Sequence, residues 1–194
     1  VVDELPLSRL FLDKYLHCLK EIKDKGYIGM ITGNHDIPRL AYLREQDEIK
    51  LAMVFLFTMP GVPFVYYGDE IGMDYIADIG SKEGGFVRTG SRTPMQWNNK
   101  KNHGFSESDT PYLTTDEREG APTVEDQIND ENSLLNFVKN LIALRKDTSV
   151  FQAEADLNVL MPSYPFIFER TYQDKKLVVA INPSKYSHSI DLKR

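Results

Sequence analysis

Three consecutive side chains that could carry chemistry, Asn34-His35-Asp36, directly follow a short apolar segment over residues 27–32. An amide, an imidazole and a carboxylate are costly to bury unless they find polar partners. At the open end of a strand they would form a polar cluster that can bind a hydroxylated substrate and stabilise positive charge. Asp36 could stabilise a cation, accept a proton or cap a loop, and His35 could be structural or contact a substrate. The residue types leave these alternatives open.

A second acidic pair, Asp69-Glu70, follows the next apolar segment, residues 63–67. If the two segments are neighbouring strands, Asp36 and Glu70 could face one another as a catalytic pair. Carboxyl groups ~5–5.5 Å apart would suit a retaining glycosidase and ~6.5–9.5 Å an inverting one; the sequence does not choose between them. No glycine-rich phosphate loop follows a strand, and the other histidines share no metal-ligand spacing, so neither a nucleotide site nor a metal site is expected.

The elements that must position these groups alternate between helix and strand. Apolar residues recur at helical spacing in three segments, residues 9–25, 46–58 and 131–146. Asp130 is the expected N-terminal cap of the last helix. The segments 27–32 and 63–67 are too short for helices and apolar on both faces, which is typical of buried parallel strands. The pattern predicts an α/β fold in which ligands bind at the carboxyl ends of the strands.

The remaining segments predict a long loop and a second domain. Residues 68–130 show no sustained periodicity, and an unstructured connection of this length inside a domain is usually functional. Farther along, residues 165–172 and 177–181 predict a hairpin, and residues 189–192 a final strand. We therefore expect a separate antiparallel domain to begin at residue 149.

Composition excludes several classes of partner. The 194 residues carry a net charge of −6 without a basic stripe, which argues against nucleic acid. No apolar run reaches the ~20 residues needed to cross a membrane, so no membrane partner is expected. The single cysteine, Cys18, excludes an intramolecular disulfide framework, and its helical context predicts a buried thiol. The chain begins without Met and ends within an expected strand, so we expect a piece of a longer protein. Its location is left open, with the cytoplasm favoured.

Three motifs in this order resemble the α-amylase family, glycoside hydrolase family 13. They are Gly33-Asn34-His35-Asp36 with Pro38-Arg39, the segment 61–73 that contains Tyr66-Tyr67-Gly68-Asp69-Glu70, and Arg92-Thr93-Pro94-Met95-Gln96-Trp97. The last motif is similar to the α-glucosidase, oligo-1,6-glucosidase and trehalose-synthase side of the family. The resemblance covers about residues 5–194. It implies that residues 1–148 form the C-terminal part of a (β/α)8 TIM barrel, with its last two strands and helices and the long loop 68–130. Residues 149–194 would then begin a β-sandwich domain.

The resemblance also implies roles for individual residues. Asp36 matches the carboxylate that stabilises the oxocarbenium-like transition state, and His35 matches a neighbouring substrate-binding histidine. Asn34, Arg39 and Arg92 are expected to bind substrate. In this family the nucleophile and the general acid lie on earlier strands, upstream of residue 1, and Glu70 does not match the acid, so the pair of Asp36 with Glu70 is set aside. No cofactor and no metal ligand are expected in these residues, and calcium in the complete protein is left open.

The expected function is therefore that of a piece of a retaining α-glucosidase or amylase-type hydrolase, which is inactive alone. Its partners would be α-linked glucose oligosaccharides and the missing N-terminal part of its own chain. One alternative is a glucosyl-transferring isomerase of the trehalose-synthase kind, and another is a non-catalytic, carbohydrate-binding relative. Unpaired strand edges of an incomplete barrel also predict self-association of the chain when it is expressed alone.

Overall fold

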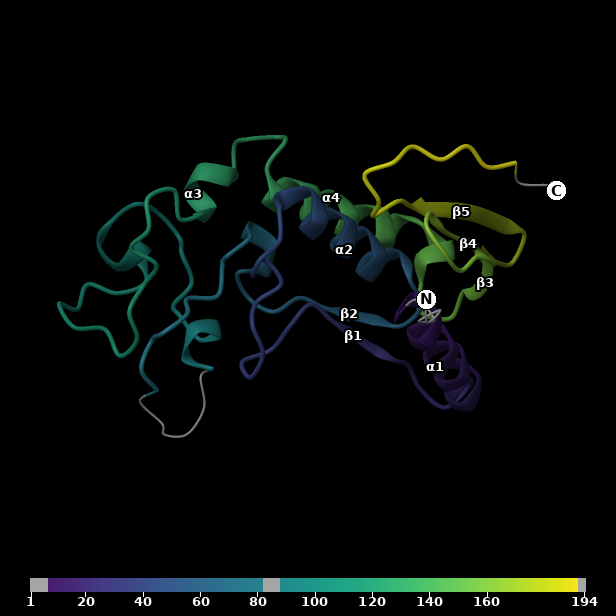
Figure 1. The fold of residues 1–194 in the computed structure, drawn as a ribbon, viewed down its shortest axis with the longest axis horizontal. Coiled ribbons are helices and arrows are strands. Elements are labelled where there is room, and N and C mark those ends of the chain that lie inside the picture. Colours follow the sequence, from purple (N-terminus) through teal and green to yellow (C-terminus); the bar gives the residue numbers. More distant parts are fainter. Residues whose placement is uncertain (1–6, 82–87, 192–194) are drawn as a thin grey trace, which may run out of the picture. The chain divides into compact units, whose positions relative to one another are not determined.

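The structure is a computed structural model that describes residues 7–81 and 88–191. Its α-helices are α1 (Leu7–Ile22), α2 (Gln46–Thr58), α3 (Val124–Gln127) and α4 (Leu134–Asp147). Its strands are β1 (Gly29–Ile31), β2 (Val62–Phe64), β3 (Asp156–Met161), β4 (Phe166–Tyr172) and β5 (Lys175–Ile181) (Figure 1). Among these described helices, none is both long and apolar enough to pass through a bilayer.

The chain divides into two compact units, which are described separately. The first comprises the described parts of Val1–Gly29, Phe57–Val62 and Arg145–Arg194, and the second comprises Met30–Leu56 and Pro63–Leu144. The expected domain boundary between residues 148 and 149 stays a prediction.

In the first unit, α1 packs through a narrow face. Leu12 and Tyr15 are buried, and the Tyr15 hydroxyl donates a hydrogen bond of 2.5 Å to the Pro60 carbonyl. Cys18 is exposed, so the expectation of a buried thiol was wrong; the contact face is too narrow to include it. The helix ends at Ile22, earlier than expected, and Asp24 takes the left-handed conformation (φ 64°) that a short polar side chain tolerates.

A three-stranded antiparallel sheet in the order β3-β4-β5 also belongs to the first unit. The expected hairpin of β4 and β5 is confirmed, with Phe166 opposite Ile181 and Tyr172 opposite Lys175. β3 was not expected; it pairs with the other edge of β4 and carries an irregularity between Val159 and Met161. The expected strand at 189–192 is absent from residues 189–191, and residue 192 lies outside the described residues.

β1 and β2 form a two-stranded sheet (Figure 1). The Val62 amide donates to the Ile28 carbonyl and the Thr32 amide donates to the Phe64 carbonyl, a progression that makes the strands parallel, as expected. The expectation that both faces are buried was wrong: Ile31 is 54% and Phe64 58% exposed. Burial on both faces requires covering layers, and a sheet of two short strands lacks flanking strands that would complete them.

The helices α2 and α4, which lie mainly in the second unit, meet the expectations closely. α2 spans the predicted residues 46–58, and Lys50 of this helix reaches the Asn132 carbonyl at 3.5 Å. α4 begins at Leu134, and its cap is Ser133, whose hydroxyl accepts a hydrogen bond of 3.2 Å from the Asn136 amide. The expected cap, Asp130, instead accepts from the Asn132 amide, one turn before the helix. The correction moves the helix start by three residues.

Candidate active site

The loop that follows β1 carries the candidate catalytic residues within the second unit. Immediately after Thr32 and the buried Gly33, the Asn34 side chain accepts a hydrogen bond of 2.8 Å from the Asp36 amide. This closes an Asx turn, a local arrangement typical of asparagine in loops. The turn leaves His35 and Asp36 exposed on the surface of the unit.

Asp36 lies in a cluster of three cationic or titratable side chains. Its Oδ1 atom accepts hydrogen bonds from Arg88 Nη1 at 2.7 Å and from Arg92 Nη2 at 3.1 Å. Its Oδ2 atom lies 3.3 Å from His35 Nε2. The Asp36 side chain is 48% exposed and that of His35 61%, so a ligand can reach both. The structure thus brings together three of the expected site residues and adds Arg88.

The two arginines are delivered by a single turn of the long loop. They flank the short 3-10 helix Thr89–Ser91, whose residues are buried. Two further hydrogen bonds tie this turn to the backbone that carries Asp36: Ser91 Oγ donates to the Ile37 carbonyl at 2.5 Å, and Arg92 Nε donates to the His35 carbonyl at 3.0 Å. The turn therefore fixes both the backbone of the loop and the charge around Asp36.

Gly90, in the middle of this turn, has no space for a side chain. A Cβ atom built there would lie 2.0 Å from the Ile76 carbonyl oxygen, a backbone atom that cannot swing aside. The Gly90 carbonyl in turn accepts a hydrogen bond of 3.3 Å from the Ile76 amide. Glycine therefore allows the backbone of residues 88–92 to pack directly on residue 76.

The electrostatics of the cluster favour an ionised Asp36. The hydrogen bond from Arg88 lowers the pKa of Asp36 below its ordinary value, and His35 and Arg92 act in the same direction. Asp36 is consequently an anion at neutral pH. Such a group can stabilise developing positive charge or accept hydrogen bonds from hydroxyl groups, and it is poorly suited to donate a proton.

Arg39 lies apart from the cluster, in the interior of the unit. It is 1% exposed, and its Nη1 atom donates a hydrogen bond of 2.5 Å to the Tyr67 carbonyl. The guanidinium lies 5.0 Å from the centre of the Tyr66 ring and 4.7 Å from that of Tyr67. Its partner in charge is Asp69, at 3.8 Å. A side chain buried in this way has no surface to offer a substrate. The burial of Arg39 therefore disagrees with the expectation that it binds substrate.

Glu70 lines an open, mainly apolar cavity of about 430 Å³. The other lining residues are Tyr67, Arg92, Pro94, Met95, Trp97, Phe105, Tyr112 and Leu113. Burial raises the pKa of Glu70. Because Arg92 both lines this cavity and bonds to Asp36, the cavity adjoins the charged cluster. Aromatic and apolar walls beside a carboxylate are a common arrangement in sites for small organic ligands.

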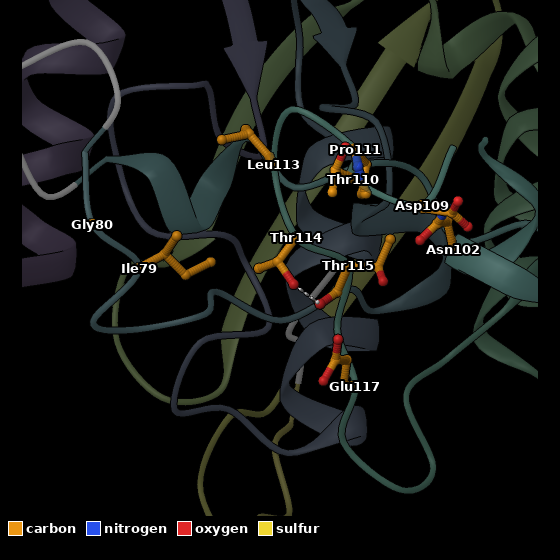
Figure 2. A pocket seen from close by; sticks show the side chains of 10 residues that line it. All are labelled: Ile79, Gly80, Asn102, Asp109, Thr110, Pro111, Leu113, Thr114, Thr115 and Glu117. Carbon is orange, nitrogen blue, oxygen red and sulfur yellow. Dashed lines mark hydrogen bonds between the residues drawn. The ribbon is translucent and has the colours of Figure 1, made fainter. Parts of the chain in front are cut away.

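A second cavity, of about 470 Å³, lies within the long loop (Figure 2). Figure 2 shows hydroxyl and carboxylate side chains around it, among them Thr110, Thr114 and Glu117, with Thr114 hydrogen-bonded to the Thr115 carbonyl. None of the site residues expected from the sequence lines this cavity. Across the described residues, no group of three or more His, Cys, Asp or Glu side chains could hold a metal ion.

Arg88 is the residue of the cluster that the sequence interpretation missed. It stands four positions before Arg92 in a segment without helical or strand periodicity, so nothing local indicated its partner. The feature of the sequence that could have indicated Arg88 is the pattern Arg-x-x-x-Arg with a central glycine. In the structure the three middle residues form a 3-10 turn, and one arginine lies on each side of it. His103, by contrast, is structural: its ring nitrogens lie 3.3 Å and 2.6 Å from the carbonyls of Asn98 and Asp116.

Comparisons with known proteins all indicate one family. The family model of the α-amylase catalytic domain matches residues 8–154 of this chain. A probable oligo-1,6-glucosidase 2 of Bacillus subtilis is 29% identical over 202 residues, covering 86% of this chain and 36% of that protein. The trehalose synthase/amylase TreS of Mycolicibacterium smegmatis is 37% identical over 161 residues, covering 77% of this chain and 25% of that protein.

Solved structures show the same fold. A mutant of the trehalulose synthase MutB in complex with its substrate sucrose superposes with a TM-score of 0.77 at 21% identity, over 91% of this chain and 38% of that one. A mutant isomaltulose synthase of Erwinia rhapontici NX5 in complex with D-glucose gives a TM-score of 0.71 at 24% identity, over 87% of this chain and 37% of that one. The chain spans about a third of the length of the first curated relatives that it matches.

Proposed function

Because this chain belongs to the α-amylase family, we propose that the gene product carrying it is a retaining glycoside hydrolase that cleaves α-glucosidic bonds in oligosaccharides. One observation carries the proposal: Asp36 is held ionised by Arg88 and Arg92 beside an exposed imidazole, at the end of a parallel strand. A fixed anion at a strand end is suited to the oxocarbenium-like transition state of glycoside cleavage.

The site residues expected from the sequence receive the following roles in this proposal. Asp36 stabilises the positive charge that develops on the sugar ring and accepts hydrogen bonds from its hydroxyl groups. His35, with its ring exposed, binds a further hydroxyl, and Arg92 binds substrate from the side of the apolar cavity. Asn34 supports the turn through the Asp36 amide. Arg39 is assigned no substrate contact, because its side chain is buried.

The covalent steps are proposed to use residues outside these 194. A retaining mechanism needs a nucleophile and a general acid besides the stabilising carboxylate. Glu70 is not assigned either role, since it does not match the acid of the family. We propose that residues 1–194 alone do not turn over substrate, because losing a covalent nucleophile forfeits most of the rate enhancement. The β-sandwich beginning at residue 149 is likewise proposed from the family, and the sheet β3-β4-β5 would be its first part.

Turnover of 4-nitrophenyl α-glucoside tests the proposal. The complete gene product is expected to release nitrophenol, and residues 1–194 alone are expected to release none. A complete protein that binds maltooligosaccharides without hydrolysing this substrate would identify the non-catalytic alternative and overturn the proposal.

A glucosyl-transferring isomerase is the second candidate, and the 37% identity to a trehalose synthase/amylase favours it. The same cluster would serve both reactions, because both pass through a glucosyl cation-like transition state. Incubation with maltose separates them: a hydrolase yields glucose, whereas an isomerase yields a rearranged disaccharide. Chromatography of the products against authentic disaccharides decides between the two.

A further inference from the structure

The buried carboxylate of Asp69 contacts the start of the loop that carries the cluster. Its side chain has no exposed surface, and its Oδ2 atom accepts a hydrogen bond of 2.6 Å from Thr32 Oγ1. The same Thr32 oxygen accepts a hydrogen bond of 2.9 Å from the Tyr66 amide. Thr32 is the last residue before Gly33, so this chain of bonds fixes the point at which the loop leaves β1.

Asp69 also contacts the end of that loop. Its Oδ1 atom lies 3.8 Å from Arg39 Nη1, an ion pair between two fully buried side chains in which this oxygen accepts no hydrogen bond from the described residues. The guanidinium of Arg39 is itself held by the Tyr67 carbonyl and by the faces of Tyr66 and Tyr67. One buried side chain therefore holds both ends of the seven-residue segment 33–39, which carries Asn34, His35 and Asp36.

Stability alone does not account for a buried ionic pair at this place. Burial raises the pKa of Asp69, while the Thr32 hydroxyl, Arg39 and the Leu40 backbone oppose that shift. Moving two charges out of water costs free energy that their attraction often fails to recover, and apolar residues of the same volume are frequently as stable. Apolar residues could not, however, bind a hydroxyl at one end of the loop and a guanidinium at the other.

We propose that Asp69 is a positioning residue for Asp36, acting through Thr32 and Arg39 to hold the loop 33–39 at both ends. The inference rests on the proposed function for its catalytic meaning. Catalytic groups must be held close to their productive geometry, and a displacement of about 1 Å can cost roughly a hundredfold in rate. Arg39, expected to contact substrate, takes a place in this buried support.

Variants of the complete gene product test the proposal. Thr32→Val removes the hydroxyl with little change of volume, Thr32→Ser keeps it, and Asp69→Asn removes the charge opposite Arg39. Thr110→Val is the matched control, since Thr110 is exposed and lies in the second cavity. For each variant, kcat is measured per active site titrated with a covalent glycosidase inactivator. The pKa of Asp36 is followed by ¹³C NMR of selectively labelled aspartate.

Thr32→Val and Asp69→Asn are expected to lower kcat roughly tenfold to a hundredfold with little change in KM. They should also raise the pKa of Asp36, because in a loosened loop the Asp36 carboxylate would move away from Arg88. Thr32→Ser and Thr110→Val should match the wild type. If Asp69→Asn does not fold, Thr32→Val decides.

A lower melting temperature with unchanged kcat per site and unchanged Asp36 pKa would overturn the proposal. A change in kcat without a change in the Asp36 pKa, or the reverse, would also overturn it. If the complete protein proves to have no glycosidase activity, the proposed function fails separately. The Asp36 titration alone then decides whether Asp69 positions the loop.

Discussion

Two arginines, Arg88 and Arg92, approach one oxygen of the Asp36 carboxylate and lower the pKa of this group. Arg88 and Arg92 both donate to Oδ1, while Oδ2 lies 3.3 Å from His35 Nε2. The group is about half exposed, so water screens these attractions and the contribution to stability is small. Their importance is therefore to keep the group anionic and oriented.

Replacing Arg88 by Gln is expected to raise the pKa of Asp36 toward its ordinary value, because the hydrogen bond from Arg88 is the largest cause of the depression. ¹³C NMR titration of the Asp36 carboxyl measures this directly. Lys101→Gln serves as a control, since Lys101 pairs with Asp109 and leaves Asp36 untouched. An Asp36 pKa that stays depressed in Arg88→Gln would contradict the assignment.

The same shift fixes the sign of a pH effect on stability. A carboxyl whose folded pKa lies below its unfolded pKa stabilises the fold above the unfolded value, and this contribution is lost as the pH falls through the folded pKa. The difference in the free energy of unfolding between wild type and Arg88→Gln should therefore be largest near neutral pH and become smaller as the pH falls into the acid range.

At the scale of elements, the turn Thr89–Ser91 is the part of the long loop that builds the cluster. It places one arginine before and one after itself, and Gly90 packs on the backbone of residue 76 without a side chain between them. The backbone of residue 76 thus packs against the turn and donates a hydrogen bond to the Gly90 carbonyl.

Gly90→Ala is expected to lower the free energy of unfolding by about 1–3 kcal/mol, because the new methyl group would overlap the Ile76 carbonyl. Gly80→Ala is the matched control: a Cβ there meets nothing within 4 Å, and its effect should stay within about 0.5 kcal/mol. Urea denaturation of both variants gives the comparison. Equal stabilities for the two would show that the close packing at Gly90 is not maintained in solution.

The elements that the sequence predicted best are those with strong local patterns. α2 begins with Asp47 and Glu48 in its first turn and is apolar nearly all round over residues 51–57, and the hairpin β4–β5 combines Phe-, Ile- and Val-rich strands with a polar turn. β3 was missed because Asp156 and Asn158 are residue types that are depleted in strands, although its partner β4 follows after only residues 162–165. The exposure of Ile31 and Phe64 was missed for another reason: burial depends on the number of layers around a strand.

The candidate site divides in the same way. His35 and Asp36 follow a strand end, and Arg92 begins a recognisable motif, so the sequence alone indicates all three as candidates. Arg88 was missed because its partner is 52 residues away. The burial of Arg39 was missed because it depends on Asp69, 30 positions later, and on two tyrosine rings; a sequence cannot distinguish a buried arginine from an exposed one without such partners.

At the scale of the molecule, the sheet β1-β2 leaves apolar side chains in contact with water. Ile31 is 54% and Phe64 58% exposed, and in the described residues these strands pair only with one another. Open strand edges beside apolar side chains favour pairing with a second copy. The complete relatives are about three times longer, which is consistent with further layers around this sheet in the family.

Residues 1–194 expressed alone are therefore expected to self-associate, and light scattering at increasing concentration measures this. Phe64→Lys should reduce the association by placing a charge at the exposed face of β2, whereas Leu43→Lys, at an exposed position outside the sheet, should not. A monomer at high concentration would show that the strand edges are protected in another way.

The central claim is that Asp36 stabilises the transition state of α-glucoside cleavage, and Asp36→Asn in the complete gene product tests it most directly. The substitution keeps the shape of the side chain and removes its charge. It is expected to lower kcat for 4-nitrophenyl α-glucoside by at least about a hundredfold, the size typical of losing one electrostatic stabiliser. Asp109→Asn, an exposed aspartate paired with Lys101, is the control and should leave kcat unchanged. Wild-type turnover by Asp36→Asn would contradict the account.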